Sequence, residues 1–121
     1  MTHTDALLAW FTENEQTCAA RAETLREDSR EDDATLERVR GNVYRMFGAM
    51  FQVAARVSEG EPASAKQLFA DRAEPLAAKW EQSHRKAELN NDVETATVER
   101  VKLDVIAEIR ARVDALGRAD A

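Results

Sequence analysis

The residues best suited to chemistry are a glutamate and a histidine one helical turn apart, Glu81 and His84. The Glu-x-x-His spacing places both side chains on one face of a helix, where di-iron bundles use it to bind metal. Such a site needs the motif twice, with a glutamate from each of two further helices, and no second copy occurs here. We therefore predict no metal site and no cofactor, and keep a metal-dependent enzyme using Glu81 and His84 only as an alternative.

The chain has a single cysteine, Cys18, so an intramolecular disulfide is impossible. Cys18 sits in a helical pattern beside two alanines, which is typical of a small buried residue. A redox role would need a basic neighbourhood that lowers the thiol pKa, and Arg21 is the one nearby cation in the sequence. We predict a structural role for Cys18.

The stretch 87–93 is similar to the Glu-Leu-Gly-Asp-Val element of all-α nucleotide pyrophosphohydrolases. Here an extra residue separates the two acids, Glu88 and Asp92, and the upstream Glu-x-x-Glu pair that binds magnesium in those enzymes is missing. The sequence also lacks a Ser-His-Asp order, a glycine-rich phosphate loop and a Cys-x-x-Cys pair. No catalytic residue is predicted, and the chain is interpreted as a protein that is not an enzyme.

The composition favours helices throughout one domain spanning residues 1–121. Only four glycines and two prolines occur among 121 residues, of which 44% are hydrophobic. The net charge of −6 disfavours binding to nucleic acids and to anionic membranes. No run approaches the roughly 20 apolar residues of a membrane span, and the polar start resembles no signal peptide. We predict a cytoplasmic protein.

Apolar periodicity and turn residues predict an antiparallel bundle of four main helices, the third interrupted at Pro75. Proline has no backbone donor and restricts the residue before it, so we expect a break there, with Asp71 and Glu74 capping a restart. Thr4 and Ser29 are expected to cap the first two helices. The predicted helices cover residues 4–28, 31–58, 62–72 plus 74–89, and 92–116.

The second helix carries two parallel apolar rows. The first row has strict three-four spacing over three heptads, and the second is aromatic and lies beside it. The first contains Leu36, Val39, Val43, Met46, Met50, Val53 and Val57, and the second contains Tyr44, Phe47 and Phe51. A face this wide predicts a central helix or one at an interface. Arginines 38, 40, 45 and 56 interleave with these rows and are interpreted as the solvated side of the helix.

These patterns favour a helical bundle that acts through contacts with protein, most simply as a homodimer. The predicted interface residues are Trp10, Tyr44, Phe47 and Phe51, because aromatic residues are enriched where partners dock. An alternative is a small-ligand pocket at the Pro75 break, lined by Trp80 and His84, because an interrupted helix frees backbone groups.

Two segments resemble a small bacterial family of uncharacterised helical proteins. They are Asp32–Phe47 and Trp80–Ile106, the latter including Asn91-Asp-Val93 and Glu99-Arg-Val-Lys-Leu103. The resemblance implies a compact bacterial helical domain and carries over no activity, cofactor or site residue.

Overall fold

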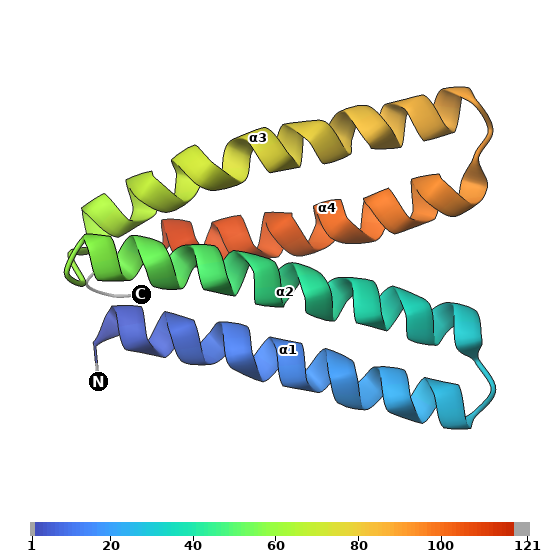
Figure 1. Cartoon of the computed structure of the whole chain (residues 1–121), viewed down its shortest axis with the longest axis horizontal. Helices are drawn as coiled ribbons and strands as arrows, with labels where there is room; N and C mark the ends of the chain where they lie inside the picture. Colours follow the sequence, from blue (N-terminus) through green and yellow to red (C-terminus); the bar gives the residue numbers. More distant parts are fainter. Residues whose placement is uncertain (1, 118–121) are drawn as a thin grey trace.

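A computed structural model describes residues 2–117, which form four helices joined by short turns (Figure 1). The helices are α1 (His3–Glu27), α2 (Glu31–Val57), α3 (Pro62–Leu89) and α4 (Val93–Asp114). Successive helices run in opposite directions, so the predicted all-α antiparallel bundle is confirmed. No helix in the described part of the chain is long and apolar enough to cross a membrane.

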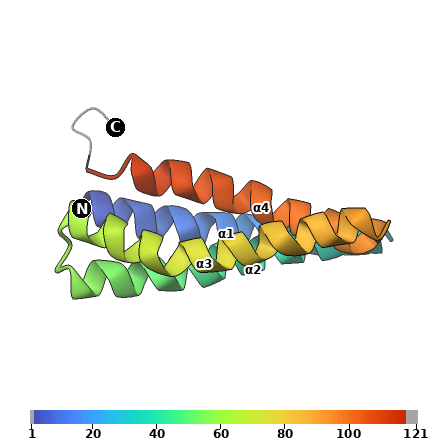
Figure 2. The ribbon, with the colours of Figure 1, turned by 90° about the horizontal axis from the view of Figure 1, so that it is seen from above.

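The central helix is α2, which contacts α1, α3 and α4. Figure 1 shows the α1–α2 and α3–α4 hairpins separating toward the end that carries their two turns. Figure 2 shows that at the opposite end the helices spread in depth, with α2 and α4 outermost. The two hairpins therefore pack together chiefly through α2 against α3 and α4.

The predicted cap of α1 is wrong by two residues. Thr2, not Thr4, is the N-cap: its Oγ1 accepts from the Asp5 backbone N–H at 3.0 Å, and the Asp5 carboxylate accepts from the Thr2 N–H at 3.2 Å. Thr4 is buried inside the first turn, and its hydroxyl donates to the Gly60 carbonyl at 3.3 Å. Thr4 therefore makes a buried hydrogen bond to the turn at Gly60 instead of capping α1.

The turn between α1 and α2 also differs from its prediction. Ser29 has a φ of 62°, in the left-handed region, and therefore ends α1 instead of capping α2. The Arg30 N–H donates to the Leu25 carbonyl at 2.8 Å, which completes this C-terminal turn. Arg30 itself is the N-cap of α2 and makes no capping side-chain hydrogen bond.

The chain turns at Gly60 and Asn91, in the gaps between the helices predicted at 31–58, 62–72 plus 74–89, and 92–116. Gly60 has a φ of 79°, and its N–H donates to the Ala55 carbonyl at 2.9 Å. Glycine adopts this left-handed conformation without steric cost, so α2 ends here. Pro62 is at the start of α3, where its missing N–H removes no hydrogen bond. Asn91 has a φ of 56°, and the Asp92 side chain caps α4.

The predicted interruption at Pro75 is wrong, because α3 continues through this residue as one helix (Figure 1). Pro75 is exposed, so water can solvate the Asp71 carbonyl that loses its amide donor. Asp71 and Glu74 do not cap a restart. The Asp71 carboxylate accepts from the Gln67 side chain at 2.9 Å, and Glu74 forms an ion pair with α4.

Packing on the opposite side of α3 holds the helix together across the proline. Ala73 and Ala77 flank Pro75 in sequence, and both are buried. Phe69 precedes the proline and Trp80 follows it, and both rings contact Phe47 edge-on, at centroid distances of 6.0 and 5.6 Å. The burial of both halves against one aromatic ring outweighs the local cost of the proline.

The core of the bundle is aromatic and contains the row of α2 that was predicted to lie at an interface. Phe47 and Phe51 are fully buried and Tyr44 nearly so. In the first apolar row of α2, by contrast, only Val43 is buried. Three aromatic rings remove more apolar surface from water than valines and methionines do, so the aromatic row faces the core.

Two glycines of α2 let α1 approach on the side away from the first apolar row. A Cβ at Gly41 would lie 3.2 Å from the Cys18 Cβ, and one at Gly48 would lie 3.1 Å from the Phe11 Cβ. The hairpin partner therefore covers the glycine side of α2. The row that begins at Leu36 is left on the opposite flank.

Candidate functional site

The fold does not bring Glu81 and His84, the residues of the alternative metal-dependent enzyme, together with further metal-binding side chains in the described part of the chain. His84 Nδ1 lies 3.3 Å from Glu88 Oε1, one helical turn toward the C-terminus. The acid beside the histidine is therefore Glu88 and not Glu81, which is exposed. His84 lines an open hollow of about 440 Å³ at the α3–α4 turn, with Asp92 and Arg100 across from it. Within residues 2–117 no three histidine, cysteine or acidic side chains gather as metal ligands.

Trp80 lies in the core rather than beside a pocket at Pro75. Its ring packs against Phe47, and the Lys102 ammonium lies 5.2 Å from its ring centroid. The hollow at His84 does not include Trp80 in its lining. Because α3 is continuous, Pro75 opens no gap, and the structure does not bring Trp80, His84 and Pro75 together.

Three of the four residues predicted at an interface lie inside the chain. Tyr44, Phe47 and Phe51 form the aromatic core and have almost no surface to offer a second chain. Trp10 is half-buried, with its ring edge-on to Tyr44 at 5.6 Å and the Arg112 guanidinium 5.1 Å from its centroid. The apolar side chains that α2 leaves exposed belong to the other row.

A polar hollow of about 260 Å³ lies where α1, α2 and α4 meet. The Tyr44 hydroxyl donates to Glu108 Oε2 at 3.0 Å, and burial together with this carboxylate raises the Tyr44 pKa. Burial and the nearby Glu37 raise the pKa of the Cys18 thiol. Both groups are therefore neutral near pH 7, and the hollow holds no activated nucleophile.

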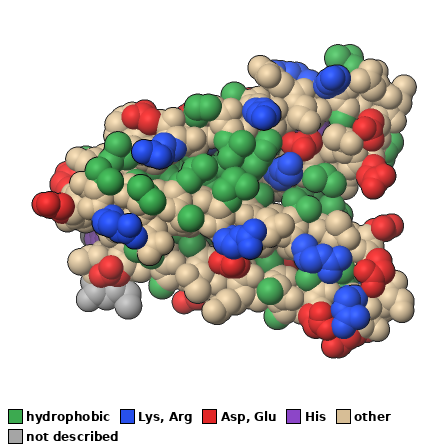
Figure 3. Space-filling model, in the orientation of Figure 1, with side chains coloured by type: hydrophobic (Ala, Val, Ile, Leu, Met, Phe, Trp, Pro, Cys, Tyr) green, Lys and Arg blue, Asp and Glu red, His purple; other side chains and the backbone are tan. Residues whose placement is uncertain are grey.

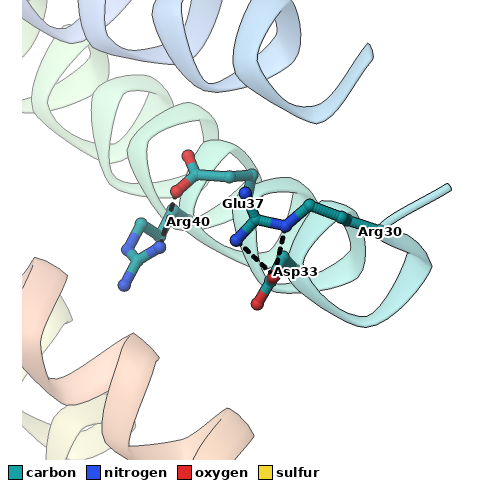
Figure 4. A network of polar contacts seen from close by, with 4 residues as sticks. All are labelled: Arg30, Asp33, Glu37 and Arg40. Atoms are coloured by element: carbon teal, nitrogen blue, oxygen red, sulfur yellow. Dashed lines mark hydrogen bonds and ion pairs between the residues drawn. The ribbon is translucent and has the colours of Figure 1, made fainter. Parts of the chain in front are cut away.

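The acid beside Cys18 belongs to a row of local ion pairs on α2 (Figure 4). Arg40 donates to Glu37 Oε1 at 2.6 Å, and Arg30 donates to Asp33 Oδ2 at 2.7 Å, each pair three residues apart. Glu37 is buried, and its Oε2 has no hydrogen-bond partner in the described part of the chain. These contacts hold the first turns of α2, while the acids that line the hollow are Asp104 and Glu108 of α4.

We expect Tyr44 to make the stability of the protein fall at alkaline pH. An unfolded tyrosine ionises near its ordinary pKa of 10.0, whereas folded Tyr44 keeps its proton to higher pH. Above that value the unfolded state binds fewer protons, so unfolding becomes easier as the pH rises. The urea midpoint from about pH 9 to about pH 11 should fall more steeply in the native protein than in Tyr44→Phe.

The sequence has one tyrosine, so tyrosinate absorbance reports the ionisation of Tyr44 directly. At neutral pH, Tyr44→Phe should cost about 0.5–1.5 kcal/mol, the net value of one hydrogen bond. Parallel loss of stability in both proteins at alkaline pH would show that another group is responsible.

The largest hollow, of about 960 Å³, lies between the first half of α3 and the second half of α4. Its floor is apolar and includes Phe69 and Val113. Two contacts span it: the Lys66 ammonium donates to the Asp114 carbonyl at 2.8 Å, and Arg110 pairs with Glu74 at 2.9 Å. The two basic side chains at its rim are thus engaged with the protein itself.

An uncovered row of apolar side chains runs along α2, and we call it the outer row. Its most exposed members are Met46, Val53 and Val57, which are 41%, 40% and 66% exposed, in contrast to the fully buried Phe47 between them. Half-buried side chains fill the gaps. The outer row consists of Leu36, Val39, Met46, Met50, Val53 and Val57.

The side of α3 next to α2 continues this apolar surface. The flank of α3 that faces α4 carries Lys66 and Glu74, which contact α4. Leu68 and Leu76 line none of the α3–α4 hollow and lie half-buried on the other flank, toward α2. Figure 3 shows apolar side chains gathered over α2 and α3, with basic side chains around them.

Sequence patterns identified the outer row but did not predict that it is exposed. The basic residues around it were interpreted as an ordinary solvated surface. The signal available in the sequence was the run from Arg38 to Ser58, which contains four arginines and no acidic residue in a chain of net charge −6. That signal becomes meaningful only when the outer row is known to be exposed.

Comparison with known proteins adds no family to this description: no family model, curated protein or solved structure matches the chain. The resemblance to small bacterial helical proteins therefore stays a prediction.

Proposed function

We propose that this protein acts through protein contacts, with the outer row of α2 as the surface on which a helix of a partner docks. The observation that carries the proposal is the exposure of Met46, Val53 and Val57 in a row that keeps strict heptad spacing. Apolar residues with this spacing are typical of a seam between helices. A contiguous exposed apolar patch of this kind is uncommon in a protein that works alone.

The length of the outer row supports a helical partner. From Leu36 to Val57 the row extends over about 32 Å at the ordinary helical rise of ~1.5 Å per residue. A helix of about three heptads would cover it and would also reach Leu68 and Leu76 on α3. Such a partner would lie along the bundle as a fifth helix.

The proposal leaves the identity of that helix open between a second copy of the chain and another protein. A homodimer would be the simplest assembly. We also place the protein in the cytoplasm of a bacterium, where a lone thiol such as Cys18 stays reduced.

The test uses a fluorescently labelled amphipathic peptide of three heptads, with leucine at the seam and glutamine beside it. We expect fluorescence anisotropy to show binding, and Val53→Asp to weaken it at least about tenfold, because a buried unpaired charge opposes docking. Val93→Asp is the matched control. Val93 is 75% exposed and lies at the start of α4, outside the outer row, so binding should be unchanged.

Light scattering and circular dichroism complete the experiment. A dimer that Val53→Asp dissociates would also support the proposal, provided that the helical content is retained. A chain that is monomeric at tens of micromolar and binds no peptide would contradict it. So would equal weakening by Val53→Asp and Val93→Asp.

A further inference from the structure

Exposed basic side chains lie beside the outer row on α2. Arg38, Arg45 and Arg56 are exposed on α2, on the side of the outer row that is away from α3. Glu23 of α1 interacts electrostatically with Arg38, but its ion-pair partner is Arg26. The arginines of α2 therefore present a basic border along one side.

The border on the other side is also basic. Arg72 and Lys79 are exposed, and helical spacing places them on the same flank of α3 as Leu68 and Leu76, toward α2. The outer row thus runs between basic side chains of two helices. Figure 3 shows basic side chains around the apolar side chains of this face, with acidic side chains between some of them and toward the ends of the molecule.

A second copy of the chain fits this surface poorly. In a two-fold symmetric dimer the same surface patch faces itself, so the flanks of one outer row lie against the flanks of the other. Basic residues on both flanks would then face basic residues at close range, which is unfavourable.

A membrane fits it poorly as well. The exposed apolar side chains of the outer row are valine and methionine, whereas the ring of Trp80 and the rings of Phe47 and Phe51 are buried. Surfaces that insert into lipid headgroups commonly use aromatic anchors, and the net charge of −6 opposes approach to anionic lipid. Heptad spacing is, moreover, the pattern of a seam between two helices, and binding to a lipid surface does not require it.

We infer that the occupant of the outer row is an acidic amphipathic helix of another protein. Its apolar seam lies on Met46, Val53 and Val57, and its flanking glutamates or aspartates face the arginines of α2 and the basic residues of α3. This inference rests on the proposed function and adds the chemistry of the partner. Attraction between opposite charges selects the partner, and apolar burial holds it.

The experiment compares two peptides with the same leucine seam, one flanked by glutamate and one by lysine. We expect the glutamate peptide to bind at least about tenfold more tightly, and to lose this advantage as salt rises from about 50 to about 500 mM. The double variant Arg45→Glu/Arg56→Glu should reverse the preference.

The matched control is Arg85→Glu/Arg100→Glu, which makes the same change in net charge at exposed sites outside the basic border. It should keep the preference for the glutamate peptide. Circular dichroism of each variant checks that the bundle remains folded.

Five results would overturn the inference. Equal binding of both peptides, still lost in Val53→Asp, would leave a helix-docking surface without charge selection. If Arg85→Glu/Arg100→Glu also reversed the preference for the glutamate peptide, that preference would depend on the total charge of the protein. A dimer dissociated by Val53→Asp would make a second copy the occupant. If the protein bound vesicles rich in phosphatidylserine and Val53→Asp abolished this binding, the occupant of the outer row would be a membrane. If the protein were a monomer and bound neither the glutamine-flanked peptide nor the two charged peptides, the proposed function would be contradicted as well.

Discussion

Phe47→Ala is expected to lower the free energy of unfolding by about 3–5 kcal/mol, a large part of the total for a domain of this size. Phe47 is fully buried and its ring contacts Phe69 and Trp80, so truncation leaves a cavity between α2 and α3. Urea denaturation followed by circular dichroism measures the change. If the variant is unfolded, Phe47→Leu, which removes less volume, gives a measurable and smaller loss.

The neighbouring residue provides the control. Met46→Ala shortens a side chain that is 41% exposed, so the free energy of unfolding should change by no more than about 0.5 kcal/mol. The pair distinguishes the buried aromatic row from the outer row on one helix. Similar losses in both variants would mean that Met46 also lies in the core and would remove the basis of the proposed docking surface.

Pro75→Ala is expected to stabilise the protein by about 1–2 kcal/mol. The substitution restores an amide donor to the Asp71 carbonyl in a helix that is already continuous, and alanine has the highest helix propensity. Part of this gain is offset because the unfolded chain becomes more flexible without the proline. Thermal unfolding should show a midpoint several degrees higher.

Ala78→Gly calibrates the experiment, because Ala78 is exposed on the same helix and its loss of helix propensity should cost about 1 kcal/mol. A less stable Pro75→Ala would show that the proline itself helps Phe69 and Trp80 to reach the same core.

Local sequence signals predicted most of the helices and turns. Glycine and proline at positions 60 and 62 mark a helix end and a helix start by their own backbone geometry, and asparagine at 91 tolerates the left-handed conformation. The prediction at Pro75 used the same kind of local rule and was wrong. Burial of alanines on the opposite side of α3 stabilises the helix there, and this packing is not visible in the local sequence.

The candidate docking surface depended on the fold in a different way. Periodicity showed that α2 has two apolar rows but gave no reason to prefer one as the core. The choice follows from α1, which packs on the side of Gly41 and Gly48, and from Phe69 and Trp80 of α3, which meet the aromatic row. The basic border on α3 likewise has meaning only because that flank lies toward α2.

The sequence by itself determined that the chain forms four helices, where they end, and that α2 has apolar residues on more than one side. These properties depend on each residue's backbone preferences and on the helical repeat. Only the tertiary structure decided that Tyr44, Phe47 and Phe51 are buried while Met46, Val53 and Val57 face solvent. The helical repeat fixes the angle between two rows on one helix, but burial depends on which neighbours pack against each row.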